Sequence, residues 1–412
     1  MPNSRDISAP FAAILPLMAA TCTALLATDL YLPSIPSLPL WLGGTLAQAQ
    51  LTLPAFFATF AVALLLYGAL AETYGRLRVL LTGMAVFLAG CVLGGLAPNI
   101  ETLLIARGMQ GAGAAAAPAV APALVREIGD RTTSIRALSW LAVCQSIVPA
   151  LGPLLGAGVL ALWGWRASFI LLVLAGGICL WALLRWRVSF AGTLATTKPE
   201  HHAAQALWRT YALVLSRTSF LGHALGYACA YGAMLTFVGS APFLLQRAYG
   251  LAPWSFAVVQ AAMVACFMAG AMSSARFVES RGVRRTIALS NGLFGVTVAI
   301  LWLIALQSMP STMLTVTLAM LPSQIGLGLR SGVSKQAAMD SVPERPSSAS
   351  AMTSFLCFGF AVIGNAVVSI FLAFQILPVA LVCLTFFLVG LAASLLPWRP
   401  ARSENSSLEI RR

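Results

Sequence analysis

Residues 72–78 read Glu-Thr-Tyr-Gly-Arg-Leu-Arg, and residues 279–285 read Glu-Ser-Arg-Gly-Val-Arg-Arg. Both stretches fit the pattern E-x-x-G-x-x-R, and they lie 207 positions apart in a chain of 412 residues. Each of them follows one long apolar segment and precedes another. A repeat at half the length of the chain predicts two related halves, with this motif in the same loop of each half.

The apolar segments dominate the composition, which is 59% hydrophobic and only 9% charged. A soluble domain carries about 25% charged residues, so the surface of this chain is expected to face lipid. A helix that crosses a bilayer needs roughly 20 mostly apolar residues. The sequence predicts an all-α membrane protein with twelve such helices, at 11–32, 50–70, 79–97, 101–124, 137–160, 167–185, 219–245, 256–275, 286–306, 312–330, 347–372 and 377–397.

The basic residues predict the orientation of these helices. An even number of spans puts both termini on one side, and that side collects 22 of the 25 basic residues, including Arg330 and Lys335. The other side has Arg166 and Arg247 only, and one further arginine lies within a span. This bias predicts cytoplasmic termini and a multi-pass protein of the bacterial inner membrane. The net charge of +13 is spread over many short loops, so we expect no nucleic-acid partner.

The longest polar connection, from Arg185 to Ser219, divides the chain. We expect an N-terminal six-helix bundle, a cytoplasmic central loop, a C-terminal six-helix bundle and a cytoplasmic tail, at 1–186, 187–218, 219–398 and 399–412. The eight cysteines lie inside apolar stretches without a CxxC pair, which indicates packing. We expect no metal, no cofactor and no catalytic residue, and a monomer surrounded by membrane lipid.

Five motifs carry a family resemblance. Residues 68–78 resemble the loop signature G-x-L-a-D-r-x-G-r-k, although Glu72 replaces the usual Asp and Thr73 the usual basic residue. The other four stretches are 29–33 (D-x-Y-x-P), 103–115 (a span-four signature with Arg and Gln), 149–156 (a span-five antiporter motif) and 165–169. In this order they resemble the major facilitator superfamily, and within it the drug–proton antiporters of the Bcr/CflA type.

The resemblance implies roles for two groups of residues. In the repeated loops it implies a conformational latch, made of Gly68, Glu72, Gly75, Arg76, Arg78, Glu279, Gly282 and Arg285. In span five it implies an antiporter motif made of Pro149, Gly152, Pro153 and Gly156. Topology charge is the alternative for the first group, and close helix packing is the alternative for the glycines of the second.

Asp29 is the one carboxylate well inside an apolar span, and such residues are rare and commonly functional. Removal from water disfavours the charged form of a carboxyl group, so we expect Asp29 to exchange a proton. Arg107 lies within span four on the same outer side and needs a partner. We expect an Asp29–Arg107 pair, direct or through water, and the resemblance implies proton coupling by both. The alternatives are a hydrated Asp29 that caps local backbone and a structural Arg107.

Substrate-binding candidates lie on four of the expected spans. His223, Tyr227, Tyr231 and Met234 follow helical spacing in span seven, and Phe57 and Phe60 lie in span two. Aromatic and methionine side chains can adapt to differing ligands, although packing is the commoner use of such residues. The remaining candidates are Tyr31 and Gln110.

Proton-coupled export of small molecules, drugs or metabolites, by alternating access is the function that these features favour. The partners would be the substrate and protons. A proton-coupled importer of a nutrient is an alternative, because a fold does not set the direction of transport. A membrane enzyme is a further alternative, but no phosphate-binding loop or cluster of catalytic groups supports it.

Overall fold

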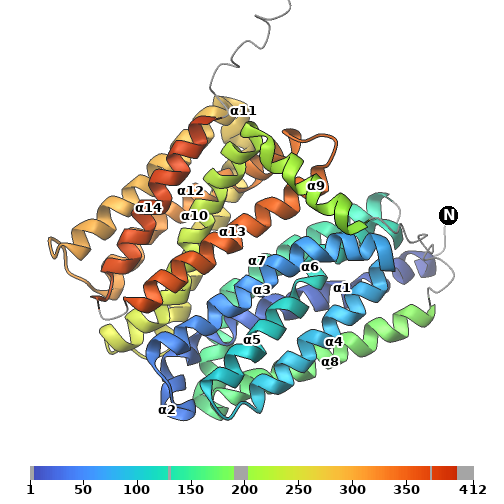
Figure 1. The fold of residues 1–412 in the computed structure, drawn as a ribbon, viewed down its shortest axis with the longest axis horizontal. Coiled ribbons are helices and arrows are strands. Elements are labelled where there is room, and N and C mark those ends of the chain that lie inside the picture. The colour runs from blue at the N-terminus through green and yellow to red at the C-terminus, as the bar shows by residue number, and fades with distance from the viewer. Residues whose placement is uncertain (1–3, 129–130, 190–202, 372–373, 397–412) are drawn as a thin grey trace, which may run out of the picture.

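The structure is a computed structural model, and it describes residues 4–128, 131–189, 203–371 and 374–396. These residues contain helices and no strand (Figure 1). The elements are α1 (Ser4–Asp29), η1 (Leu32–Ser37), α2 (Leu38–Leu42), α3 (Leu46–Tyr74), α4 (Arg76–Gly95), α5 (Ile100–Ala114), α6 (Ala116–Ile128), α7 (Arg131–Trp163), α8 (Arg166–Ser189), α9 (Ala203–Ser216), α10 (Thr218–Phe243), η2 (Leu244–Ala248), α11 (Trp254–Ala305), α12 (Met313–Asp340), α13 (Pro346–Ile370) and α14 (Leu377–Leu395). The expected tail at 399–412 lies outside the described residues.

Eight of the described helices are long and apolar enough to cross a membrane. Large apolar side chains of these helices, such as Ile178, Met272 and Leu388, remain exposed, as lipid contact requires. The expected span 101–124 is divided at Ala115 into α5 and α6, each shorter than a bilayer needs. The expected spans 256–275 and 286–306 both lie within α11.

Local sequence signals explain where several helices begin. The Thr45 side chain accepts from the Gln48 backbone N–H and the Gln48 side chain accepts from the Thr45 N–H, so a capping box starts α3. Thr312 and Thr315 form the same arrangement at α12. The helix α3 therefore begins four residues before the expected start of its span.

The glycines of the repeated motif share one backbone conformation. Gly75 has φ 90° and ψ 135° between α3 and α4. Gly282 has φ 79° and ψ 162° in the middle of α11, where it separates two helical parts. This region is open to glycine and costs other residues about 1–3 kcal/mol. The motif therefore makes the same sharp turn in each half of the chain.

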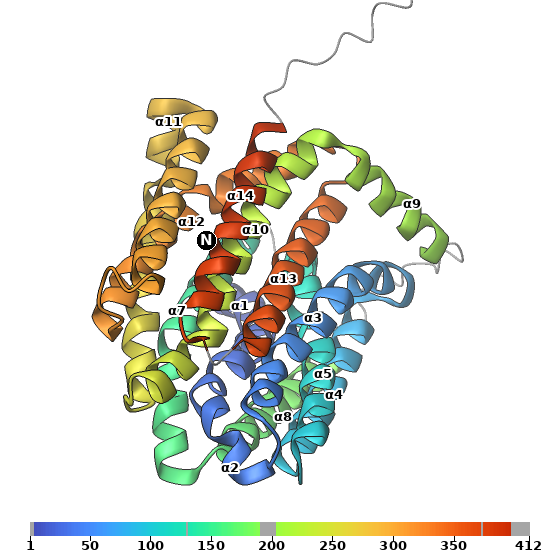
Figure 2. The same ribbon diagram turned by 60° about the vertical axis from the view of Figure 1, so that its left-hand side comes forward.

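The helices form two groups (Figures 1 and 2). In the first group α4 packs on α5 and α8, and α1 packs on α7. In the second group α11 packs on α12, and α10 packs on α13 and α14. The groups meet where α3 lies along α13, where α7 lies along α11 and where η1 touches α10. The short helix α9 extends from the second group toward the first (Figure 2).

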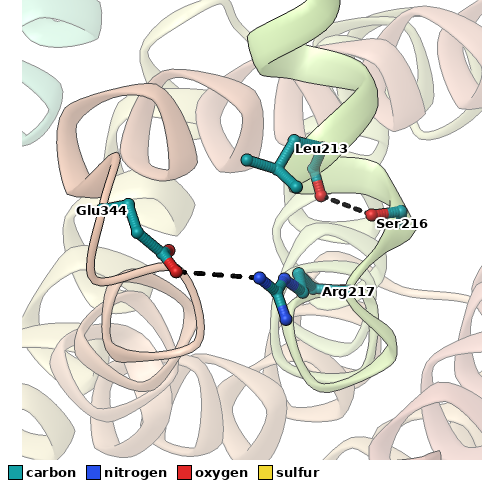
Figure 3. A network of polar contacts seen from close by, with 4 residues as sticks. All are labelled: Leu213, Ser216, Arg217 and Glu344. Atoms are coloured by element: carbon teal, nitrogen blue, oxygen red, sulfur yellow. Dashed lines mark hydrogen bonds and ion pairs between the residues drawn. The ribbon is translucent and has the colours of Figure 1, made fainter.

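Polar contacts hold the two ends of the molecule differently. One end of the molecule carries η1 and η2 and is called the η1 end. There the Gln246 side chain donates to the Pro33 carbonyl at 3.0 Å, and Arg247 donates to the Pro36 carbonyl at 2.9 Å. At the opposite end, the α9 end, Arg217 and Glu344 form an exposed ion pair at 3.7 Å inside the second group (Figure 3). An exposed pair of this kind contributes about 0–1 kcal/mol.

The shared turn gives a stability test. We expect Gly75→Ala and Gly282→Ala each to lower the free energy of unfolding by about 1–3 kcal/mol, because alanine is strained at this φ and ψ. The measurement is the thermal unfolding midpoint of the purified protein in detergent. Gly292→Ala is the control, since this glycine has helical geometry and nothing within 4 Å of an added Cβ. Equal midpoints for all three variants would contradict the assignment.

Candidate functional site

A cavity of about 400 Å³ lies between the two groups of helices. Its walls come from α1, η1, α3 and α7 of the first group and from α10, α11, α12 and α13 of the second. Six of the sequence-predicted site residues for proton coupling and binding line it, namely Asp29, Phe57, Phe60, Tyr227, Tyr231 and Met234. Pro149 of the antiporter motif lines it as well.

Asp29 is the last residue of α1, and 7% of it is exposed. Its Cβ would lie 2.6 Å from a Cβ placed on Gly152 of α7, so the two helices touch at this point. Within the described part of the chain, no basic side chain lies within ion-pair distance of Asp29. A carboxyl group at the C-terminal end of a helix also faces the negative end of the helix dipole. Both features make the charged form of Asp29 unfavourable in this setting.

Arg107 of α5 is completely buried and contacts the end of α1 by another route. Its Nη1 donates to the Ala27 carbonyl at 3.0 Å and to Gln110 Oε1 at 2.8 Å. The guanidinium carbon lies 4.5 Å from the centre of the Tyr31 ring and 4.6 Å from that of Phe56. Arg107 is therefore held by a carbonyl, an amide and two aromatic faces.

The expected direct Asp29–Arg107 pair is absent from the structure. Residues 27 and 31 are four apart and present one side of the α1 end to Arg107. Residue 29 stands two positions from each, which places its side chain on the opposite side of a helix. The Asp29 side chain accordingly faces the cavity and α7.

Three other candidates also lie away from the cavity wall. The Tyr31 hydroxyl donates to Thr52 Oγ1 at 3.0 Å, and its ring packs against Phe169. Gln110 accepts from Arg107 and extends its polar network by donating to Cys91 Sγ at 3.1 Å. His223 lies on α10, near Arg330. Tyr31 and Gln110 thus support the wall from behind.

The antiporter motif brings α7 against the end of α1. An added Cβ on Gly156 would overlap the Leu30 carbonyl, and one on Gly152 would meet Asp29. Pro149 and Pro153 lie inside α7, where each removes one backbone hydrogen bond. The small residues of this motif therefore set how closely α7 approaches Asp29.

Two basic residues of the second group, Arg330 and Lys335, were expected at and beyond the end of the span 312–330, and the structure corrects where this helix ends. The helix α12 continues to Asp340, ten residues beyond the expected end of its span, and includes both. Arg330 is 1% exposed and donates to Asn291 Oδ1 at 2.8 Å and to Ser334 Oγ at 3.3 Å. Lys335 lines the cavity. The absence of Gly and Pro between 333 and 342 was the available signal.

The residues of the proposed latch lie in the last two turns of α3 and the start of α4, and around Gly282 inside α11. Gly68, Glu72, Arg78, Glu279, Gly282 and Arg285 are exposed, whereas Gly75 and Arg76 are partly buried. The Tyr211 hydroxyl of α9 donates to the Leu65 carbonyl of α3 at 3.1 Å. Burial and the negative charge of nearby Glu72 raise the pKa of the Tyr211 phenol. Glu72 therefore lies close to α9 in this conformation.

Comparisons with known proteins agree with this arrangement. Residues 17–365 match the sequence model of the family described as the Major Facilitator Superfamily. A chloramphenicol resistance protein of Pseudomonas aeruginosa is 28% identical over 93% of this chain and 90% of its own length. A multidrug transporter MdfA of Edwardsiella piscicida is 31% identical over 54% of each chain. A crystal structure of a peptide transporter, POT, in complex with sulfate shares the fold, with a TM-score of 0.72, 14% identity and 94% coverage of each chain.

The contact between α1 and α7 can be tested with matched glycines. We expect Gly156→Ala to lower the free energy of unfolding by about 1–3 kcal/mol, because the added methyl overlaps the Leu30 backbone. Gly158→Ala should leave it unchanged or raise it slightly, since nothing lies within 4 Å of that Cβ. Thermal unfolding in detergent measures both. A Gly156→Ala variant as stable as Gly158→Ala would show that α1 and α7 do not touch here.

Proposed function

Because the chain belongs to the Major Facilitator Superfamily, we propose that it exports small molecules across the bacterial inner membrane in exchange for protons. The family and the named relatives make it a membrane transporter, not an enzyme. Beyond membership of the family, the proposal specifies protons as the coupling ion, export as the direction of transport, twelve membrane crossings and cytoplasmic termini. It also assigns the cavity between the two groups of helices as the substrate site.

Asp29 is the observation that carries the proposal. It is a buried carboxyl group that lines the cavity and lacks an ion-pair partner within the described residues. Such a group can be neutral with a proton or charged without one, and its surroundings decide between the two states. If the cavity faces one side of the membrane at a time, Asp29 can take up a proton from one side and release it to the other. A proton gains about 2.3 kcal/mol per 100 mV as it crosses the membrane.

Alternating access is supported by the contacts between the groups. The short η1 contacts of Gln246 and Arg247 tie the groups together at one end, and Gln50 of α3 donates to Ser240 of α10 at 3.4 Å in the same region. These bonds involve few residues, and in two of them the acceptor is a backbone carbonyl of the short 3-10 helix η1. They can be exchanged for contacts at the α9 end, where the repeated loops lie, at modest free-energy cost.

Arg107 acts in this scheme as a positioning residue for the end of α1. The last carbonyls of a helix have no intrahelical donor, and Arg107 supplies one to Ala27. Its positive charge also offsets the negative end of the α1 dipole, where Asp29 must become charged in each cycle. Arg107 thereby supports Asp29 without a direct ion pair.

Drug export is favoured over nutrient import by the cavity wall and the relatives. Phe57, Phe60, Met234 and Tyr231 offer an apolar and aromatic surface with few fixed polar groups. Surfaces of this kind accept molecules of differing shape. The relatives named for chloramphenicol resistance and for multidrug transport point the same way. Chloramphenicol is therefore the first substrate to test.

The orientation can be tested by reporter fusions. We expect green fluorescent protein fused after Arg412 to be fluorescent and alkaline phosphatase at the same place to be inactive. The first reporter works in the cytoplasm and the second only outside it. The matched control fuses both reporters after Gly250, between η2 and α11, where the opposite pattern is expected. An active phosphatase after Arg412 would overturn the proposed topology.

Proton coupling can be tested in everted membrane vesicles that contain the protein. We expect a pH gradient to drive chloramphenicol uptake by the wild type and Asp29→Asn to reduce this uptake to background. Exchange of labelled for unlabelled chloramphenicol without a gradient should persist in Asp29→Asn, since the substrate wall is intact. Glu101→Gln is the control, because Glu101 is exposed and outside the cavity. Full gradient-driven uptake by Asp29→Asn would disprove the assignment of the proton site.

A further inference from the structure

Lys335 is a basic side chain on the wall of the cavity that the transport scheme above does not use. It projects from α12, five residues before the end of that helix. Its Nζ lies 5.5 Å from the centre of the Tyr227 ring, which also lines the cavity. No carboxylate lies within ion-pair distance of it in the described part of the chain. Its hydrogen-bond donors are therefore available to a ligand.

Asp29 and Lys335 belong to different groups of helices and face the same cavity. Asp29 ends α1 toward the η1 end, and Lys335 lies in the last two turns of α12 toward the α9 end. The Tyr231 phenol lines the same cavity and is close enough to both of them to interact electrostatically with each. The cavity thus has an acidic pole, an aromatic middle and a basic pole.

The surrounding charges make the basic side dominant. Arg107 lies directly behind Phe56 of the wall, at 4.6 Å from the ring centre. Arg330 interacts electrostatically with Tyr227 of the wall and is itself buried. Asp29 is the one acidic residue among the described lining residues. Once Asp29 holds a proton, the charges in and around the cavity are positive, and those of the buried Arg107 and Arg330 are weakly screened by salt, whereas Lys335 is exposed.

The middle of the cavity is an aromatic cluster that joins the two groups. Phe358 of α13 lies 5.5 Å from Phe57 and 4.7 Å from Phe60 of α3, between ring centres. It also lies 5.9 Å from Tyr231 of α10. These separations are typical of interacting aromatic rings, and a planar ligand can join such a cluster.

We propose that Lys335 binds an anionic or electron-rich acceptor group of the substrate, such as a carboxylate, nitro or carbonyl group, while an aromatic part packs on Phe57, Phe60 and Phe358. A charge-assisted hydrogen bond to Lys335 is stronger than a neutral one. A cation meets repulsion at Lys335 and finds only Asp29 to pair with, in competition with the proton. The cavity therefore selects aromatic molecules that are neutral or anionic over cations of the same shape. This inference rests on the proposed function for the use of the cavity, but the binding preference itself needs no proton gradient.

Three ligands that share one ring system test the preference. They are 1-naphthylacetate, 1-naphthylacetamide and 1-naphthylmethylammonium, and equilibrium dialysis against the purified full-length protein in nanodiscs measures each Kd. We expect the carboxylate to bind about tenfold more tightly than the ammonium, with the amide between them. Lys335→Met should remove this difference, because it keeps the length of the side chain and loses the charge. Lys335→Arg should retain it.

Arg209→Met is the matched control, since it removes one positive charge from exposed α9, outside the cavity. It should leave the ratio of Kd values unchanged. Equal binding of the three ligands by the wild type, binding of none of them, or an unchanged ratio in folded Lys335→Met would overturn the proposal. The proposal would also be overturned if Arg209→Met reduced the ratio of Kd values as much as Lys335→Met does. If Lys335→Met does not fold, the ratio in Lys335→Gln decides. If the wild type shows the expected ratio of Kd values but no gradient-driven chloramphenicol transport, the proposed proton-coupled export is overturned and the binding preference stands.

Discussion

The hydrogen bond from Arg107 to the Ala27 carbonyl is the contact on which the arrangement of the cavity depends. Lipid supplies no donors, so the carbonyls at the end of a membrane helix must find partners within the protein. Ala27 is one of the last residues of α1, and its carbonyl receives a charged donor from α5. This contact lets α1 end inside the apolar region and pass into η1, instead of continuing to the surface. The break places Asp29 at a helix terminus on the cavity wall.

Close packing around this break fixes which way Asp29 faces. The glycines at 152 and 156 let α7 approach the backbone of residues 29 and 30, and larger side chains would not fit. On the other side, Tyr31 fills the space between Arg107 and Phe169. Asp29 is therefore confined between α7 and the cavity, whereas Arg107 is enclosed by protein. A carboxyl group that borders a space open to ligand can change its protonation state, and a fully enclosed guanidinium keeps its charge.

The sequence predicted the parts of this site that follow from periodicity and rarity. The lone carboxylate within a span, the aromatic residues at helical spacing in α10 and the repeated glycine turn all lie where those patterns indicated. It could not predict the rotation of α1, because a helix surrounded by protein and lipid has apolar residues on every side. The prediction of a direct Asp29–Arg107 pair was wrong for that reason. Arg330 was expected at the end of its span and Lys335 beyond it, because charge in a membrane protein usually marks a helix end. Their partners Asn291, Ser334 and Tyr227 become visible only in three dimensions.

The two halves use the same frame with different chemistry. In each half, a buried arginine extends toward the first helix of that half. Arg107 of α5 reaches α1, and Arg330 of α12 lies beside Gly226 of α10. Arg107 binds a backbone carbonyl because α1 ends there. In the second half α10 continues unbroken to Phe243, so its carbonyls are already bonded within the helix and Arg330 takes side-chain acceptors instead. Asp29, at the end of α1, is the acidic wall residue of the first half, and Lys335 is the basic wall residue of the second. The two groups of helices thus share one frame, in which the end of α1 brings Asp29 and α12 brings Lys335 to the wall of the cavity between them.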